Sequence, residues 1–169
     1  MADIVSPAKR SQMMAGINGK DTKPELQVRK ALYARGFRYR LHNKKLPGKP
    51  DIVLAKYNTA IQVNGCFWHG HEDCHLFRFP KSRVEFWENK IGGNIARDKV
   101  NLEQLEKLGW RVLVIWECAL KGKGRIGIDT VAEATTNFIR SQDNKFGFIR
   151  GNHQDKTAAT IQYYAEFPC

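Results

Sequence analysis

The stretch Pro50-Asp51-Ile52-Val53-Leu54-Ala55, followed after four residues by Ala60-Ile61-Gln62-Val63-Asn64, decides the fold. Both runs are rich in β-branched and apolar residues, and the short gap between them suits a β-hairpin. A hairpin brings a carboxylate at the start of one strand close to groups on the next strand, where together they can hold a divalent metal ion. Asp51 is therefore a candidate metal ligand. The alternative interpretation is a turn residue before a strand.

Helix signals flank this hairpin. Thr22-Lys23-Pro24-Glu25 has the pattern of a capping box at a helix start, and Gly36 ends the helix. Residues 37–41 alternate apolar and basic side chains, as a strand does. After the hairpin, residues 84–108 have helical periodicity, which we expect Gly92-Gly93 to interrupt.

The second half of the chain contains a buried strand and a last helix. Residues 110–116 form a nearly continuous apolar run, typical of a strand buried on both faces, and residues 129–140 fit a helix. No pattern is evident from Ser141 onward, so residues 141–169 are a C-terminal tail of unknown role. Residues 22–140 therefore predict one α/β domain, in which a central mixed sheet carries helices on both sides.

The order of these elements and the position of Asp51 match restriction-endonuclease-like nucleases of the PD-(D/E)xK type. In that group an acidic-x-Lys triad follows the Pro-Asp on the adjacent strand, whereas this chain has Gln62-Val63-Asn64. The motif is thus incomplete. A Mg²⁺ ion at Asp51 would need backbone oxygens, water and a nucleic-acid phosphate to complete its coordination, and this ion accepts such ligands readily.

The charge of the chain is uneven. The 169 residues carry a net charge of +11, and residues 1–50 hold 12 basic and 3 acidic side chains, which accounts for nine of those charges. This predicts attraction to a polyanion, with residues 1–21 as a basic N-terminal arm, but charge alone does not distinguish DNA, RNA and an anionic membrane. The longest strongly apolar run, residues 112–116, is too short to span a bilayer, and we expect an intracellular protein without a secretion signal.

The loop Asn64-Gly65-Cys66-Phe67-Trp68-His69-Gly70-His71-Glu72-Asp73-Cys74-His75 concentrates metal-ligating residues. Three thiolates and one imidazole are a donor set that structural Zn²⁺ prefers, and a cysteine after the buried strand can complete it. The candidate ligands are Cys66, His71, Cys74 and Cys118. The alternative is that Cys66 and Cys118 are ordinary buried thiols.

Two other histidines of this loop are rival ligands, His69 and His75. His69 also lies close in sequence to the end of the hairpin, so it could instead be a general base that activates water. We expect Cys169, at the extreme C-terminus, to be spare.

Phe67 and Trp68 lie side by side in this loop, and Trp87 follows in the next helix. One interpretation buries all three in the core. The other uses them as wedges that unstack bases and kink a duplex. Basic residues interleaved with them favour the second interpretation: Lys81, Arg83, Lys90 and Arg97.

The sequence resembles the very short patch repair (Vsr) family of DNA mismatch endonucleases over about residues 9–140. The resemblance is carried by motifs in matching order and spacing: Leu46-Pro47-Gly48-Lys49-Pro50-Asp51, Gly65-Cys66-Phe67-Trp68-His69, Arg83-Val84-Glu85-Phe86-Trp87-Glu88-Asn89-Lys90-Ile91, Asn94, Arg97-Asp98, Leu108-Gly109-Trp110-Arg111-Val112 and Trp116-Glu117-Cys118-Ala119-Leu120.

The resemblance implies a strand-specific, Mg²⁺-dependent enzyme that nicks DNA on the 5′ side of the thymine in a T·G mismatch, as left by deamination of 5-methylcytosine. It implies that Asp51 and the backbone carbonyl of Val63 bind Mg²⁺, and that His69 activates the attacking water. It also implies roles for further residues: Glu25, Asn64 and Asp98 at the catalytic site; Cys66, His71, Cys74 and Cys118 on Zn²⁺; and Met14, Phe67, Trp68, Trp87, Lys90 and Asn94 on DNA.

Two departures from the family pattern stand out. Members carry Thr-His where this chain has Val63-Asn64, and the zinc loop has one residue more between His71 and Cys74. A backbone carbonyl does not depend on its side chain, so Val63 leaves a metal ligand in place. An amide is neither an acid nor a base, so Asn64 cannot perform the chemistry of a histidine.

Three hypotheses follow from the sequence. The first is the mismatch-nicking endonuclease, a cytoplasmic bacterial monomer whose partners are mismatched double-stranded DNA and other mismatch-repair proteins, with no membrane. The second is a zinc-stabilised DNA-binding module that has lost its activity at positions 63–64. The third is a related nuclease with altered mismatch or sequence specificity, including a restriction endonuclease that cuts matched DNA.

Overall fold

A six-stranded mixed sheet forms the centre of the described molecule. The computed structural model describes residues 5–152 and 160–168. The strands lie side by side in chain order: β1 (Arg40–Leu41), β2 (Ile52–Leu54), β3 (Thr59–Asn64), β4 (Arg111–Trp116), β5 (Phe146–Ile149) and β6 (Ile161–Tyr164). The pairs β3·β4 and β4·β5 are parallel, and the other three pairs are antiparallel.

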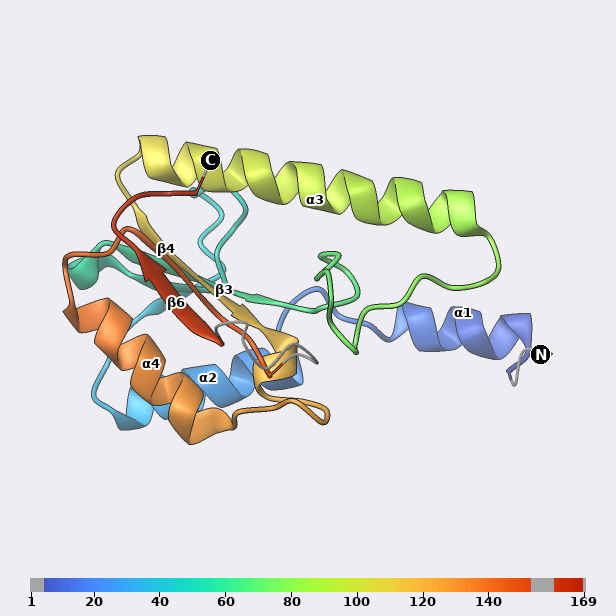
Figure 1. Cartoon of the computed structure of the whole chain (residues 1–169), viewed down its shortest axis with the longest axis horizontal. Coiled ribbons are helices and arrows are strands. Elements are labelled where there is room, and N and C mark those ends of the chain that lie inside the picture. Colours follow the sequence, from blue (N-terminus) through green and yellow to red (C-terminus); the bar gives the residue numbers. More distant parts are fainter. Residues whose placement is uncertain (1–4, 153–159, 169) are drawn as a thin grey trace.

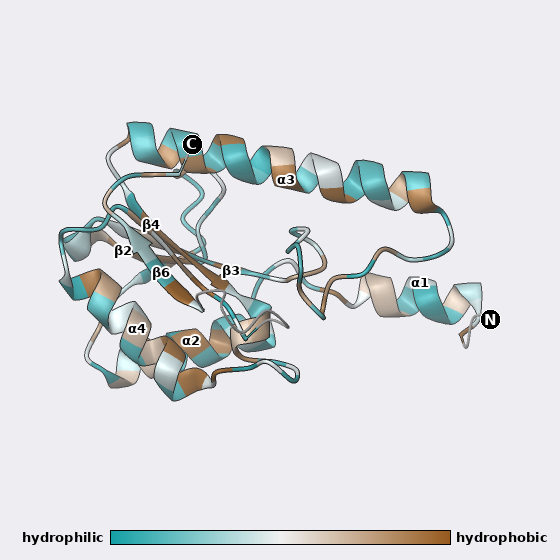
Figure 2. Ribbon diagram, in the orientation of Figure 1, coloured by the Kyte–Doolittle hydropathy of each residue, from teal (hydrophilic) through white to brown (hydrophobic). Residues whose placement is uncertain are grey.

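Helices cover both faces of this sheet (Figure 1). They are α2 (Lys23–Ala34) and α4 (Ile128–Arg140) on one face and α3 (Val84–Lys107) on the other. The side chains of β4 explain this arrangement, because alternate residues of a strand point to opposite faces. Leu113 and Ile115 join the cluster that contains α2 and α4, whereas Val112 and Val114 pack with Leu105 of α3. Figure 2 shows the apolar strands enclosed between the helices. The predicted mixed α/β architecture is confirmed.

The first helix, α1 (Pro7–Ala15), lies away from the sheet in Figure 1 and buries none of its residues. Pro7 follows the N-cap residue Ser6, whose side chain accepts a hydrogen bond from the Lys9 amide, so local signals define this helix. No helix in the described part of the chain is both long and apolar enough to cross a membrane.

Three local expectations differ from the structure. The strand expected over residues 37–41 is reduced to Arg40–Leu41. Helix α3 runs without a break through Gly92 and Gly93, because a glycine inside a helix costs only about 1 kcal/mol. The segment after Ser141, where no element was expected, contributes β5 and β6 to the sheet.

Candidate active site and metal centre

Asp51 lies directly before β2 and faces the neighbouring strand. The register of the hairpin pairs Ile52 with Ile61, which places Asp51 beside the far end of β3. The Val63 amide donates a hydrogen bond of 2.8 Å to Oδ2 of Asp51. Burial, together with the charge of Glu25, raises the pKa of the Asp51 carboxyl to about 6, against the lowering effect of the Val63 hydrogen bond. The nearby His42 and Arg29 act in the opposite direction.

An open cleft of 520 Å³ lies in front of this carboxylate. It brings together five residues that the sequence singled out, with lysines and amides around them. The lining residues are Gly19, Lys20, His42, Lys44, Gly48, Lys49, Asp51, Gln62, Val63, Asn64, His69, Asp98 and Asn101. The predicted group Asp51, Val63, Asn64, His69 and Asp98 therefore shares one cavity, although these residues come from β3, from α3 and from the segments that precede β2 and follow β3.

His69 and Asp98 form a contact pair in the cleft. Nδ1 of His69 is 2.5 Å from Oδ2 of Asp98, and both side chains are about 30% exposed, at 30% and 27%. A carboxylate on Nδ1 orients the ring and leaves Nε2 as the nitrogen that can accept a proton. This is the arrangement that a general base needs. Asn64, in contrast, is buried at the cleft wall.

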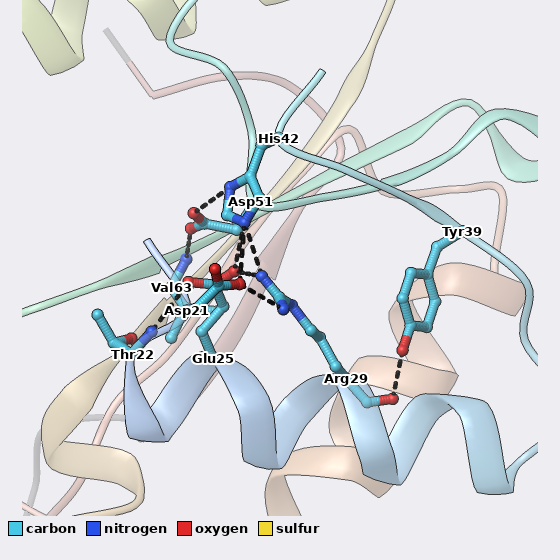
Figure 3. Close-up of polar contacts among 8 residues, drawn as sticks. All are labelled: Asp21, Thr22, Glu25, Arg29, Tyr39, His42, Asp51 and Val63. Carbon is cyan, nitrogen blue, oxygen red and sulfur yellow. Dashed lines mark hydrogen bonds and ion pairs between the residues drawn. The ribbon is translucent and has the colours of Figure 1, made fainter. Parts of the chain in front are cut away.

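Glu25 is connected to Asp51 through a polar cluster that Figure 3 displays. Its carboxyl is 2% exposed, accepts from the Thr22 amide as the capping box predicts, and forms an ion pair with Arg29. Nε2 of His42 is 3.1 Å from Oε1 of Glu25, and Nδ1 of the same ring is 3.7 Å from Oδ1 of Asp51. Glu25 thus lies behind Asp51 rather than in the cleft lining.

Sequence reasoning missed His42, Arg29 and Asp21. His42 could have been found from the pairing of β1 with β2. In this pairing Leu41 lies opposite Ile52, so the next residue, His42, lies opposite Asp51. The amide of His42 indeed donates to the Asp51 carbonyl at 3.2 Å. The two-residue strand is too short for its register to be read from the sequence.

The four predicted zinc ligands meet in one buried cluster. One donor atom from each of Cys66, His71, Cys74 and Cys118 lies within 4.8 Å of the other three. Nδ1 of His71 is 3.4 Å from Sγ of Cys66 and 3.6 Å from Sγ of Cys118. Hydrogen bonds from the Cys66 thiol, then from His71 and the Gly151 amide, lower the pKa of Cys118 to about 3. The rival ligands His69 and His75 are not members of this cluster.

The aromatic residues of the loop pack against one another beside the cleft. The Phe67 ring is 5.2 Å from Trp68 and 5.3 Å from Trp87, centroid to centroid, and all three side chains are half-buried. Nδ2 of Asn94 donates to the Trp68 carbonyl at 2.8 Å, so this amide supports the aromatic loop. Lys90 is exposed on α3, the helix that also carries Trp87 and Asn94. Met14 is half-buried on α1 and is absent from the cleft lining.

Comparisons of the sequence with known proteins identify a family. The model of the family described as DNA mismatch endonuclease Vsr matches residues 2–76. The DNA mismatch endonuclease Vsr of Escherichia coli is 41% identical over 139 residues, which are 82% of this chain and 88% of that protein. The chain belongs to the Vsr family.

Other relatives of this chain are named as nicking enzymes. The type II nicking enzyme V.NmeAIP of Neisseria meningitidis is 51% identical over 123 residues, which are 73% of this chain and 87% of that enzyme. The type II nicking enzyme V.XorIIP of Xanthomonas oryzae is 44% identical over 126 residues, covering 75% and 92% of the two chains. The Vsr resemblance predicted from the motifs is thereby confirmed.

Proposed function

We propose that this protein is a Mg²⁺-dependent, strand-specific endonuclease that nicks DNA on the 5′ side of the thymine in a T·G mismatch. A nicking endonuclease is the class that the Vsr membership indicates. The observation that carries the proposal is the cleft in which Asp51, held by the Val63 amide, faces the same cavity as the His69–Asp98 pair. A nucleic-acid phosphate in this cavity would meet a metal ligand, a general base and the ammonium groups of Lys20, Lys44 and Lys49.

The donors at Asp51 fit magnesium. A carboxylate and a backbone carbonyl are hard oxygen ligands, and Mg²⁺ keeps several waters in addition to one or two such groups. Asp51 and the carbonyl of Val63 would hold the ion. A bound Mg²⁺ supplies Lewis acidity that stabilises negative charge on the scissile phosphate.

The chain's own residues supply the proton transfer and the orientation. Asp98 fixes the His69 ring through Nδ1, and Nε2 of His69 accepts the proton of the attacking water. Asn64 lines the cleft as a hydrogen-bonding amide, and Glu25 stands behind Asp51 as a buried support. Although the acidic-x-Lys part of the motif is missing, one cavity contains a base, His69, and a metal ligand, Asp51, as in a restriction-endonuclease-like site.

The second cluster fits zinc. Three thiolates and one imidazole at mutual distances within 4.8 Å suit a tetrahedral ion with Zn–S bonds of about 2.3 Å. Such an ion would tie Cys66, His71 and Cys74 to Cys118 in η2 (Glu117–Ala119), directly after β4. Phe67, Trp68 and His69 lie between Cys66 and His71, so we assign zinc a structural role in presenting them.

Recognition of the mismatch is assigned to the exposed side of the same loop. Phe67, Trp68 and Trp87 would enter the base stack, with Lys90 and Asn94 beside them. The basic arm with Met14 would close over the opposite groove. We further propose a cytoplasmic monomer that works on double-stranded DNA with other mismatch-repair proteins.

The experiment that tests this function is cleavage of a duplex panel carrying each mismatch in varied flanking sequences, with one end-labelled strand. We expect a nick in the thymine strand of T·G duplexes that requires Mg²⁺. Asp51→Ala should lose cleavage and still bind the T·G duplex, and Glu103→Gln, an exposed change on α3, should retain both.

Other outcomes of the panel contradict the proposal specifically. Binding of T·G duplexes without a nick at any Mg²⁺ concentration would indicate a DNA-binding module. Equal cutting of matched duplexes would indicate a restriction activity. Cleavage by Asp51→Ala would exclude Asp51 as the metal ligand.

A further inference from the structure

A backbone amide from the C-terminal part of the chain reaches one of the four candidate zinc ligands. The Gly151 amide donates a hydrogen bond of 3.2 Å to Sγ of Cys118, although the two residues are 33 positions apart in sequence. Both residues are buried. A backbone N–H group can only donate, so the direction of this bond does not depend on the protonation of the sulfur. The contact connects the Cys/His cluster to the segment after Ser141, for which the sequence indicated no role.

The register of two parallel strands places this amide. Ile115 of β4 pairs with Ile149 of β5. Parallel strands advance in the same direction, so the residues that follow this pair leave the sheet at the same edge. Cys118 comes three residues after Ile115, and Gly151 comes two residues after Ile149. The sheet therefore brings the sulfur and the amide together.

Only a residue without a side chain fits at position 151. A Cβ there would overlap the carbonyl oxygen of Cys118 and would lie 2.8 Å from that of Gly124. The next amide, that of Asn152, donates a hydrogen bond of 2.7 Å to the same Gly124 carbonyl. The backbone after β5 is thus packed directly against the segment that carries Cys118, and this close approach is what allows the Gly151 amide to reach the sulfur.

A loaded Cys/His cluster needs such a donor. Three thiolates bring one negative charge more than Zn²⁺ neutralises, and a neutral imidazole adds no charge. Cys66, Cys74 and Cys118 are 0%, 6% and 1% exposed, so water does not solvate this excess charge. An N–H group directed at a thiolate compensates part of it, and a donor that contacts a ligand rather than the metal also fixes the orientation of that ligand.

We propose that the Gly151 amide is a positioning group of the Cys/His metal centre, which donates to the metal-bound thiolate of Cys118 and makes the backbone after β5 a part of that centre. The presence of a metal ion in the cluster rests on the proposed function. The contact between the amide and the sulfur does not.

The direct test is nuclear magnetic resonance on the full-length protein loaded with ¹¹³Cd²⁺ in place of zinc. A hydrogen bond from an amide to a metal-bound sulfur transmits a scalar coupling between the amide proton and the metal nucleus. We expect this coupling at the Gly151 amide proton. Its absence would overturn the proposal if the Cβ protons of Cys66, Cys74 and Cys118 do couple to the metal. Absence of coupling at these cysteine protons as well would contradict the metal centre itself, and the proposal with it.

Gly151→Ala tests the contact by displacement. The added methyl group should move the amide away from Cys118, and loss of such a donor should weaken zinc binding about 10- to 100-fold in competition with a chelator. Gly147→Ala is the matched control in β5, because its Cβ would lie 2.9 Å from Cδ1 of Tyr163 and 3.1 Å from Cδ1 of Leu113. This control disturbs the packing of the strand without contacting Cys118, so it should lower the melting temperature and leave the zinc affinity unchanged.

The two variants separate a positioning role from a purely structural one. Wild-type zinc affinity in a folded Gly151→Ala protein would overturn the proposal. An equal loss of affinity in Gly147→Ala would also overturn it, because any disturbance of β5 would then weaken the centre. If Gly151→Ala does not fold, the coupling measured on the wild-type protein decides.

Discussion

At the scale of residues, Asp51 is placed where its ionised form is disfavoured. The carboxyl is 20% exposed, and burial, followed by the charge of Glu25, raises its pKa from 3.8 to about 6. A raised pKa means that the folded protein binds this proton more tightly than the unfolded chain does. The free energy of unfolding therefore falls as the pH rises from about 4 to about 6, and stays lower above that range. A bound cation would offset this cost, which is why a buried carboxylate is useful at a metal site.

Replacing this carboxylate should stabilise the protein at neutral pH. Asp51→Asn removes the charge and keeps an acceptor for the Val63 amide, so we expect the free energy of unfolding to rise by about 1–3 kcal/mol near pH 8 and to change little near pH 4. Urea denaturation of zinc-loaded protein without Mg²⁺ measures both values. Glu103→Gln controls for loss of an exposed charge. An equal gain in the free energy of unfolding at both pH values would show that ionisation of Asp51 is not the cause of the gain.

At the scale of elements, the loop that follows β3 is held from two sides. The Cys/His cluster fastens it to the end of β4, and Gly70 packs it against α3. Gly70 has φ +59°, and a Cβ there would lie 2.6 Å from Cδ1 of Ile95 and 3.0 Å from Cγ2 of Ile91. His69 and its aromatic neighbours are thus positioned by contacts that lie outside the cleft.

A methyl group at position 70 should loosen this packing. Gly70→Ala combines a strained backbone with the clash against Ile95, and we expect it to destabilise the protein by about 1–3 kcal/mol and to lower the nicking rate. Gly93→Ala is a matched control, because a Cβ there meets nothing within 4 Å in the middle of α3, and it should stabilise slightly. Thermal melting and single-turnover nicking measure the two effects. Equal melting temperatures for both variants would contradict the role of Gly70.

The Cys/His cluster makes a separate prediction. Cys118→Ser removes the one donor that comes from outside the loop, so zinc content should fall well below one ion per chain and the melting temperature should drop by about 10 °C. Elemental analysis and calorimetry measure the two quantities on the same sample. Cys169→Ser leaves all four donors in place and should change neither. Full zinc content in Cys118→Ser would overturn this ligand set.

At the scale of the whole molecule, charge and chemistry are separated along the chain. Nine of the net eleven positive charges come from residues 1–50, which contain α1, α2 and the lysines at one rim of the cleft. The metal-ligating loop and the aromatic cluster come from residues 51–118, where charges nearly balance. In the proposed function, the first part holds the duplex electrostatically, and the second selects and cuts the site.

This separation predicts a steep salt dependence of binding. With roughly 6–10 phosphate contacts, the affinity for any duplex should fall about 10³-fold or more between roughly 50 and 200 mM salt, because bound counterions are released. Fluorescence anisotropy with Asp51→Ala, which should not cut the probe, gives the slope for matched and T·G duplexes. We expect similar slopes for the two duplexes with a constant difference in affinity, since the proposed function assigns reading of the mismatch to the aromatic residues. A flat response would contradict the role assigned to the basic arm.

Local patterns in the sequence determined the elements that carry the chemistry. The hairpin, helix α2 and helix α3 were predicted to within about two residues, because β-branched runs, a capping box and helical periodicity are short-range signals. Of the motifs that indicated the Vsr family, residues 83–91, Asn94 and Arg97-Asp98 lie at or in helix α3, and the others lie beside the hairpin and around β4. The glycine pair in α3 was over-interpreted, because packing of one face outweighs the weak propensity of two residues.

Only the tertiary structure decided which distant groups meet. β5 forms because β4 offers a partner more than thirty residues away in sequence, and β6 then pairs with β5. The contact of His42 with Asp51 depends on the register of a two-residue strand. Glu25 and Arg29 have the i,i+4 spacing of a helical ion pair, but no sequence pattern indicates that Asp21 and His42 also contact Arg29. The physical reason is range. Capping hydrogen bonds and apolar periodicity involve residues that are close in sequence, whereas the electrostatics of a buried site depend on groups that become neighbours only when the sheet forms.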